Sequence, residues 1–136
     1  KEGVLSIGGE HLNREGGFVW NRPKFISEEY FVKMKKGIVK NNRILIVKDG
    51  ATTGKVSFVD KNKNFPIEPA AINEHLFQLT IDSSQAVPKY VFYYLYSHRG
   101  QKDILRNFRG ATVGGIGLDF PRHIKIPLPF NTAFAC

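Results

Sequence analysis

Cysteine is nearly absent from this chain: the only one among its 136 residues is the last, Cys136. This excludes a disulfide framework and a cysteine-based metal site, and it is typical of proteins kept in the reducing cytoplasm. Long apolar runs are missing too. No stretch approaches the roughly 18 residues that a membrane span needs, and the first residues lack the apolar core of a signal peptide. We therefore expect a cytoplasmic protein that has no membrane partner.

Motifs for nucleotide, cofactor and metal chemistry are incomplete. Residues 50–55, Gly-Ala-Thr-Thr-Gly-Lys, resemble a phosphate-binding P-loop, but too few residues separate the glycines, and Val56 replaces the Ser or Thr that would hold Mg²⁺. Residues 114–117, Gly-Gly-Ile-Gly, lack the glycine spacing of a dinucleotide site. The histidines are scattered, and no acidic cluster for Mg²⁺ or activated nucleophile is visible. We expect no cofactor, no metal ion, no small-molecule substrate and no catalytic residue.

What the chain has in excess is positive charge. Its 20 Lys and Arg residues against 12 Asp and Glu residues give a net charge of +8. Such a balance favours a phosphate-bearing or otherwise acidic partner. Between residues 33 and 48, six cations occur without an acid: Lys33, Lys35, Lys36, Lys40, Arg43 and Lys48. Two interpretations stay open for this run, a contact surface for the acidic partner or a solvated face of the protein.

The apolar pattern predicts one folded α+β domain. A hydrophobic content of 42% is enough for a core, and the length fits a single domain. Ser27 predicts the start of a helix over 27–36, and an apolar stripe predicts a longer helical region over 88–108, broken near Gly100. Strands are predicted from β-branched or alternating apolar residues over 43–48, 55–60, 77–81 and 123–128. Because the order lacks βαβ regularity, we expect a short, curved mixed β-sheet, a few helices, long glycine-rich loops and an irregular segment over 61–74.

Two glycine-rich loops share the triplet Gly-Ala-Thr, the first at residues 49–55 and the second at residues 109–117. Glycine lets a backbone or a ligand come close, and each loop has a cation beside it, so we expect them to form a binding face for an anionic partner. The alternative for the first loop is a hairpin turn whose lysine is merely solvated. The candidate contact residues are Lys48, Thr52, Thr53 and Lys55 at the first loop and Arg106, Arg109, Thr112 and Arg122 around the second.

Five short segments carry a resemblance to a known family: Ser-Ile-Gly-Gly-Glu (6–10), Phe-Ile-Ser-Glu-Glu-Tyr (25–30), Asp-Gly-Ala-Thr-Thr-Gly-Lys (49–55), Val-Pro-Lys-Tyr-Val-Phe-Tyr-Tyr-Leu (87–95) and Gly-Ala-Thr-Val-Gly-Gly-Ile (110–116), which leads to Ile-Lys-Ile-Pro-Leu-Pro (124–129). In this order they resemble the target-recognition domain of the specificity subunit of type I restriction-modification systems, a domain also fused in some type II enzymes. The resemblance places the domain at residues 1–129.

Two departures from the family pattern accompany this resemblance. The family usually has Gly-Asp where this chain has Asn41-Asn42, so the turn before the following strand is expected to differ. The family also continues into a long spacer helix after the segment that ends here at Pro129. Since the chain in addition begins without methionine, we expect it to be a piece of a longer protein, with residues 130–136 as a truncated tail.

The resemblance implies a function in DNA recognition. A domain of this kind reads one half of a split DNA site, while a second domain reads the other half and long helices set the spacing. The methyltransferase (M) and restriction (R) subunits are separate partners, so the domain itself is expected to be non-catalytic. Lys and Arg would hold phosphates of double-stranded DNA, and the loops would address base edges in the major groove. The alternative is a basic protein-interaction module that docks an acidic partner subunit and does not read bases.

Overall fold

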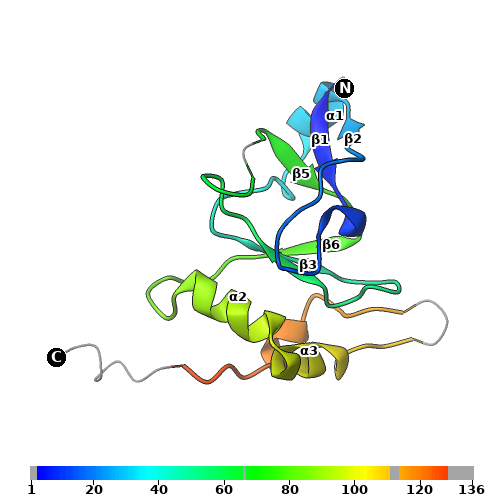
Figure 1. Ribbon diagram of the computed structural model, residues 1–136. Coiled ribbons are helices and arrows are strands. Elements are labelled where there is room, and N and C mark those ends of the chain that lie inside the picture. The colour runs from blue at the N-terminus through cyan, green and yellow to red at the C-terminus, as the bar shows by residue number, and fades with distance from the viewer. Residues whose placement is uncertain (1–2, 66, 111–113, 129–136) are drawn as a thin grey trace.

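Three layers make up the fold: a first sheet, a second sheet and a pair of helices, stacked from top to bottom in Figure 1. The computed structural model describes residues 3–65, 67–110 and 114–128. Its strands are β1 (Val4–Ile7), β2 (Lys24–Ile26), β3 (Ile44–Val47), β4 (Val56–Phe58), β5 (Ala70–Ile72) and β6 (Leu76–Leu79). Its helices are α1 (Glu28–Lys33), α2 (Pro88–Tyr96) and α3 (His98–Leu105), with the 3-10 helices η1 (Gly9–His11) and η2 (Phe120–His123).

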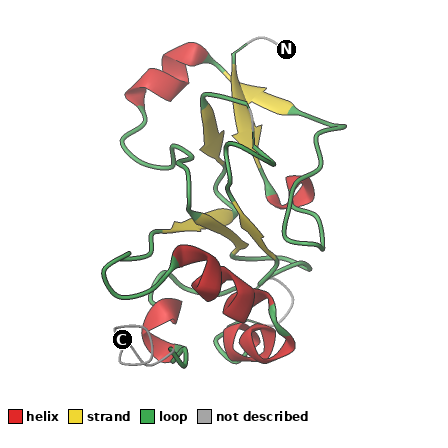
Figure 2. Cartoon of the chain, turned by 60° about the vertical axis from the view of Figure 1, so that its left-hand side comes forward, coloured by secondary structure: helices red, strands yellow, loops and turns green. Residues whose placement is uncertain are grey.

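Helices and strands are segregated along the molecule, as an α+β fold requires. Figure 2 shows α2 and α3 together below the second sheet, and α1 at the opposite end beside the first sheet. The α+β class predicted from the sequence is therefore confirmed. None of the helices in the described ranges has both the length and the apolar character needed to span a bilayer.

β1 is the central strand of the first sheet, between β2 and β5. It runs antiparallel to β2, with Leu5 opposite Phe25, and parallel to β5, with Leu5 opposite Ala70. β5 falls within residues 61–74, for which the prediction of an irregular segment was wrong. Its sequence, Ala-Ala-Ile, has little intrinsic strand preference, so pairing with β1 and burial of both alanines stabilise the strand.

The second sheet is antiparallel throughout, in the order β4-β3-β6. All four residues of β3 are buried, because both faces of this sheet are covered. Leu45 and Val47 belong to the core shared with the first sheet, whereas Ile44 and Ile46 belong to the core shared with α2 and α3. The strands predicted for β3, β4 and β6 are confirmed with shifted ends. They form one of two small sheets, where the sequence led us to expect a single curved sheet.

Serine side chains begin two of the helices. Ser27 starts α1 as predicted, since its hydroxyl accepts a hydrogen bond from the Tyr30 backbone N–H at 3.0 Å. The longer predicted helical region is present, but it is interrupted at Ser97, whose hydroxyl accepts from the Gly100 N–H at 3.1 Å and caps α3. Gly100 lies inside α3, where a Cβ would stand 1.9 Å from the Tyr94 carbonyl oxygen. Glycine there permits the close approach of α2 and α3 and does not break the helix.

The strand predicted over residues 123–128 is wrong. η2 ends at His123, and residues 124–128 form no strand. Ile124 and Ile126, whose alternation led to the prediction, pack instead against the core that the second sheet shares with α2 and α3. The Tyr90 hydroxyl donates a hydrogen bond to the Pro127 carbonyl and holds the segment there.

Candidate functional site

The two glycine-rich loops lie next to each other and are joined by main-chain hydrogen bonds. The Gly50 N–H donates to the Gly114 carbonyl at 3.1 Å, and the Ile116 N–H donates to the Lys48 carbonyl at 2.7 Å. A Cβ on Gly115 would stand 2.2 Å from the Lys48 carbonyl oxygen, so glycine is required for this approach. Both loops project from the same edge of the molecule in Figure 1. We call this hydrogen-bonded contact the loop joint.

Each loop is also closed at its own base. Arg109 and Gly115 exchange two main-chain hydrogen bonds of 2.8 and 2.9 Å across the second loop. In the first loop, Thr53 donates to the Gly50 carbonyl through its N–H at 3.2 Å and through its hydroxyl at 2.6 Å. Gly50 and Gly54 adopt positive φ angles of 88° and 95°. The first loop therefore has a defined shape, and the Thr53 hydroxyl is engaged in maintaining it.

Three of the predicted residues of the first loop line a cleft with a turn near the N-terminus. The cleft has a volume of about 420 Å³, and Asn13 and Arg14 line it together with Thr52, Thr53 and Lys55. The pKa of Lys55 is lowered from its ordinary value, first because its amine is partly buried and then because Arg14 repels its charge. We call this site the Arg14–Lys55 cleft.

Sequence reasoning missed Arg14. The residue lies in a turn in which the Asn13 side-chain oxygen accepts hydrogen bonds from the N–H groups of Glu15 at 2.9 Å and Gly17 at 2.8 Å. The segment Asn-Arg-Glu-Gly-Gly is a turn signal that can be recognised in the sequence. Its position beside the first loop, however, results from tertiary packing, and no local pattern indicates which distant loop the turn contacts.

Lys48 and Arg109 share a second cleft, of about 620 Å³, beside the loop joint. The Lys48 Nζ lies 5.2 Å from the centroid of the Phe77 ring, within the range of a cation–π contact. The Arg109 guanidinium folds back and donates to the carbonyl oxygens of Arg106 at 3.2 Å and Phe108 at 3.0 Å. The two cations therefore line the same cleft, together with the acids Asp49 and Asp119.

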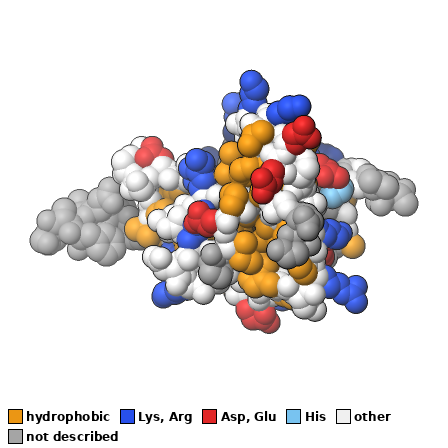
Figure 3. Space-filling view, turned by 90° about the horizontal axis from the view of Figure 1, so that it is seen from above, with side chains coloured by type: hydrophobic (Ala, Val, Ile, Leu, Met, Phe, Trp, Pro, Cys, Tyr) orange, Lys and Arg blue, Asp and Glu red, His pale blue; other side chains and the backbone are white. Residues whose placement is uncertain are grey.

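Lys48 also lines a larger groove of about 1360 Å³ between α1 and β6. Five cations and a single acid, Glu74, are among the described residues that line it; the cations are Lys35, Lys36, Lys40, Arg43 and Lys48. The cations between residues 33 and 48 are thus mostly gathered along one groove, which favours a contact surface over a scattered solvated face. Figure 3 looks down on the end with the first sheet and shows an apolar strip with both basic and acidic side chains around it.

Comparison with known families agrees with the resemblance inferred from the short segments. The family model described as the type I restriction modification DNA specificity domain matches residues 6–131. The chain belongs to this family. A search of curated proteins gives no match.

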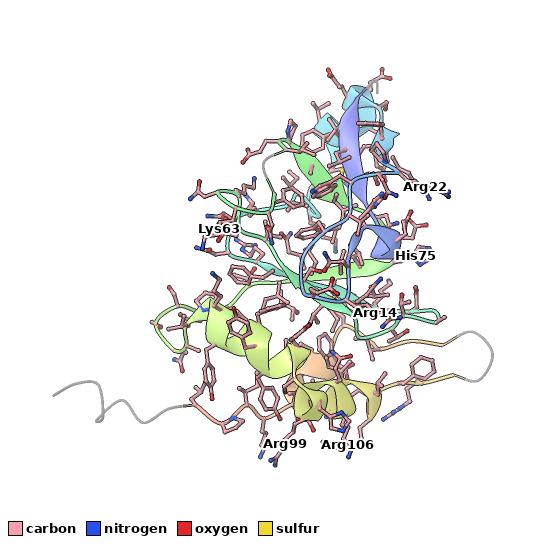
Figure 4. All side chains as sticks on the ribbon, viewed as in Figure 1. Arg14, Arg22, Lys63, His75, Arg99 and Arg106 are labelled. Atoms are coloured by element: carbon pink, nitrogen blue, oxygen red, sulfur yellow. The ribbon has the colours of Figure 1, made fainter. Side chains whose placement is uncertain are left out.

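The other residues predicted for the site of this specificity domain are dispersed. Arg106 is exposed and forms an ion pair with Asp103. Figure 4 shows Arg106 and Arg99 at the outer side of α3, away from the Arg14–Lys55 cleft. Arg122 is exposed on η2 and lines neither the cleft at the loop joint nor the Arg14–Lys55 cleft. Thr112 lies outside the described residues.

The Asp103 carboxylate distinguishes the surroundings of Arg106 from those of the cations at the loops. It accepts hydrogen bonds from the Tyr94 hydroxyl and from the Arg106 guanidinium. These contacts, the Tyr94 hydroxyl first, hold the pKa of Asp103 below its ordinary value. The Arg106 guanidinium is therefore already engaged by an acid within the specificity domain.

Two histidines of the specificity domain, His11 and His75, contact turns and loops. Within the described ranges, no group of three or more His, Cys, Asp or Glu residues could hold a metal ion. His11 is buried, and its Nδ1 accepts from the Gly8 N–H at 3.0 Å while its Nε2 lies 2.8 Å from the Arg22 carbonyl oxygen. His75 contacts the Asp49 carboxylate at 2.7 Å, at the base of the first loop. Both histidines therefore fix the positions of turns.

Proposed function

We propose that this specificity domain binds double-stranded DNA sequence-specifically through the surface around the loop joint, and that it catalyses no reaction itself. Residues 1–129 make up the recognition domain. In the full system it directs the methyltransferase and restriction subunits to one half of a bipartite DNA site, as the family resemblance implies. Membership of the specificity-domain family and the net charge of +8 support this proposal.

The observation that carries the proposal is the loop joint. Hydrogen bonds between residues 48–50 and residues 114–116 hold two projecting loops in one arrangement. Loops whose bases are held together before binding lose less conformational entropy when they contact DNA than independent loops would. A fixed spacing between the loops also suits recognition of a fixed spacing between base edges.

The residues around the loop joint receive distinct proposed roles. Lys48 and Lys55 hold backbone phosphates, because an ammonium group acts as a compact point charge. Arg109 contacts a guanine, whose O6 and N7 atoms match the two-pronged geometry of a guanidinium. Thr52 contacts a base edge or a sugar-phosphate oxygen, whereas Thr53 maintains the loop through its bond to the Gly50 carbonyl.

The remaining predicted residues have secondary roles in the proposal. Arg106 contributes less binding energy than Arg109, because Asp103 already opposes its charge. Arg122 makes a peripheral phosphate contact from its exposed position on η2. Thr112 stays in the proposal on the basis of the sequence alone, as part of the second loop.

A second candidate function is supported by the outer face of α3. This face has a small hollow lined by His98, Arg99, Lys102, Asp103 and Arg106. Figure 4 shows its labelled arginines directed away from the rest of the molecule. An acidic surface of a partner subunit would complement it, and the domain would then be a protein-interaction module whose DNA contacts lie elsewhere in the parent chain.

Selection of bound oligonucleotides from a random duplex pool at physiological salt tests the proposed function. We expect enrichment of one short motif, because specific readout adds to the sequence-independent attraction of charge. The control is the variant Lys55→Gln/Arg109→Ala, which removes two cations near the loops and leaves those of α3 in place, and which should lose the enrichment. Binding of the unaltered chain without any enriched motif would contradict sequence-specific recognition and favour the interaction module.

A further inference from the structure

The two sides of the Arg14–Lys55 cleft are anchored to the same strand. The turn with Arg14 is fixed to β4 by the Phe58 N–H, which donates to the Gly16 carbonyl at 3.0 Å, and by the Ser57 hydroxyl, which donates to the Gly17 carbonyl at 2.7 Å. Lys55 directly precedes β4 in the chain. Because one short strand holds both sides, the fold sets the spacing between the backbone of Arg14 and that of Lys55.

Residues of the helical layer hold the cleft from below. The Tyr96 hydroxyl donates to the Arg14 carbonyl at 2.9 Å, and the Gln101 amide donates to the Gly54 carbonyl at 2.9 Å. Tyr96 and Gln101 also line the cleft itself. The backbone beside each cation is thus tied to α2 or α3, so the cleft is a preformed feature of the domain.

The positive charge in this cleft has no opposing acid of its own. Neither Arg14 nor Lys55 takes part in any of the ion pairs among the described residues. The acid that acts on Lys55 is Glu10, but its carboxylate is ion-paired with Lys24 at 2.8 Å. Two like charges held close together, one of them partly buried, repel each other in the free protein. A bound anion would relieve that repulsion.

We propose that the Arg14–Lys55 cleft binds one phosphate group of the DNA backbone, with Arg14 and Lys55 sharing its charge. A guanidinium and an ammonium on opposite sides of a cleft supply charge-assisted donors to different phosphate oxygens, and the Thr52 hydroxyl adds a neutral donor beside them. The inference rests on the proposed function, and it assigns to Arg14 the task of fixing the position of the first loop on the duplex.

The salt dependence of DNA binding tests this inference first. Affinity for the selected duplex is measured over a range of salt concentrations for the unaltered chain and for Arg14→Gln and Lys55→Gln. Each variant should shallow the slope of log affinity against log salt by up to about 0.9, the value for one lost phosphate contact. Lys63→Gln is the matched control, since Lys63 lies on the opposite side of the molecule in Figure 4 and its loss should leave the slope unchanged.

Neutral phosphate substitutions then locate the contact on the DNA. A set of duplexes is prepared in which one phosphate at a time is replaced by a methylphosphonate, and each is bound to the unaltered chain and to Arg14→Gln. At one position, the loss of about tenfold expected for the unaltered chain should become smaller in the variant, because that phosphate no longer contacts Arg14 and keeps only Lys55. Additive losses at every position, with circular dichroism showing both proteins folded, would overturn the inference.

The possible failures are distinguishable. If the unaltered chain enriches a motif but Arg14→Gln and Lys55→Gln keep the full salt slope, the phosphate cleft is wrong and the proposed function stands. If no duplex binds, both are wrong. In that case, a melting temperature that rises with inorganic phosphate in the unaltered chain but not in Arg14→Gln would identify a site for free phosphate in place of DNA.

Discussion

The Arg14–Lys55 cleft and the outer face of α3 are both rich in cations, but they differ in what opposes the charge. In the cleft, the two cations take part in no ion pair among the described residues. On α3, the Arg106 guanidinium contacts the Asp103 carboxylate, which also accepts a hydrogen bond from Tyr94. A count of cations along the sequence therefore does not identify an anion site. The acids that folding brings beside the cations decide which of them are available.

The largest expected effect comes from separating the two loops at the loop joint, while the Arg14–Lys55 cleft and the α3 face stay as they are. In Gly115→Ala, the new Cβ would meet the Lys48 carbonyl oxygen at 2.2 Å, so one loop must move. We expect DNA binding to weaken by about 2–4 kcal/mol and the enriched motif to be lost. Titration with the selected duplex measures the first effect, and repeated selection measures the second.

Gly117→Ala is the matched control for this variant. Its Cβ would meet only the tip of the Asp119 side chain, at 3.0 Å, which can rotate away. Affinity and motif should stay close to those of the unaltered chain. Equal losses in both variants would show that the second loop is generally intolerant of side chains and would remove the support for a specific loop joint.

Arg109 and Arg106 allow a comparison between an arginine outside the described ion pairs and one that is paired with Asp103. Arg109→Ala should weaken DNA binding by about 1–3 kcal/mol and relax the preference at one base pair, as expected for a guanine contact. Arg106→Ala should cost at most about 1 kcal/mol, because its charge is already paired with Asp103. Binding to a panel of duplexes with single base changes checks both. Uniform weakening by Arg109→Ala across the panel would make it a phosphate contact.

The basic groove between α1 and β6 provides a third test. Lys35→Gln/Lys36→Gln removes two of the five cations that line it. If DNA passes along this groove, the salt slope should become shallower by up to about 0.9 for each lost contact, with little change in sequence preference. The slope is measured with a random duplex and with the selected duplex. An unchanged slope would mean that this run is a solvated face.

The smallest effect is expected from Asp103, through the pH dependence of the free energy of unfolding. The pKa of Asp103 is depressed in the folded protein, so its contribution to the free energy of unfolding is present above the unfolded pKa of about 3.9 and is lost as pH falls through the folded value. Asp103→Asn should therefore lose less stability than the unaltered chain on acidification below about pH 4. Urea unfolding at a series of pH values checks this. Parallel curves for the two proteins would show that Asp103 carries no such contribution.

Much of the fold could be predicted from the sequence where local signals and packing agree. The dense β-branched run of β3 predicts a buried strand, and Ser27 predicts the start of α1. The prediction was wrong where tertiary contacts override the local pattern. Ile124 and Ile126 alternate as in a strand, but they pack against the core that the second sheet shares with α2 and α3. Ala70 becomes part of a strand only because β1 pairs with it.

Part of the candidate site could be predicted from local sequence signals, and the part that depends on tertiary contacts could not. Glycine content and neighbouring cations indicated both loops, including Lys48, Lys55 and Arg109, whose proposed DNA contacts stay predictions. The pairing of Arg106 with Asp103 three residues earlier follows helical spacing and could have been recognised. Arg14 could not have been assigned, because its place beside Lys55 depends on hydrogen bonds between a turn and β4 that have no local sequence signal.

The loop joint has a consequence for how recognition specificity could change. Main-chain hydrogen bonds join Lys48 and Gly50 to Ile116 and Gly114. The two loops should therefore keep their arrangement only when both are inherited together, even though they are far apart in the chain. If only one loop were transferred into a related domain, its main-chain groups would lose their hydrogen-bond partners at the loop joint. New specificities should therefore arise by substitution at loop tips or by transfer of the whole domain, and hybrids that recombine between the loops should recognise DNA poorly.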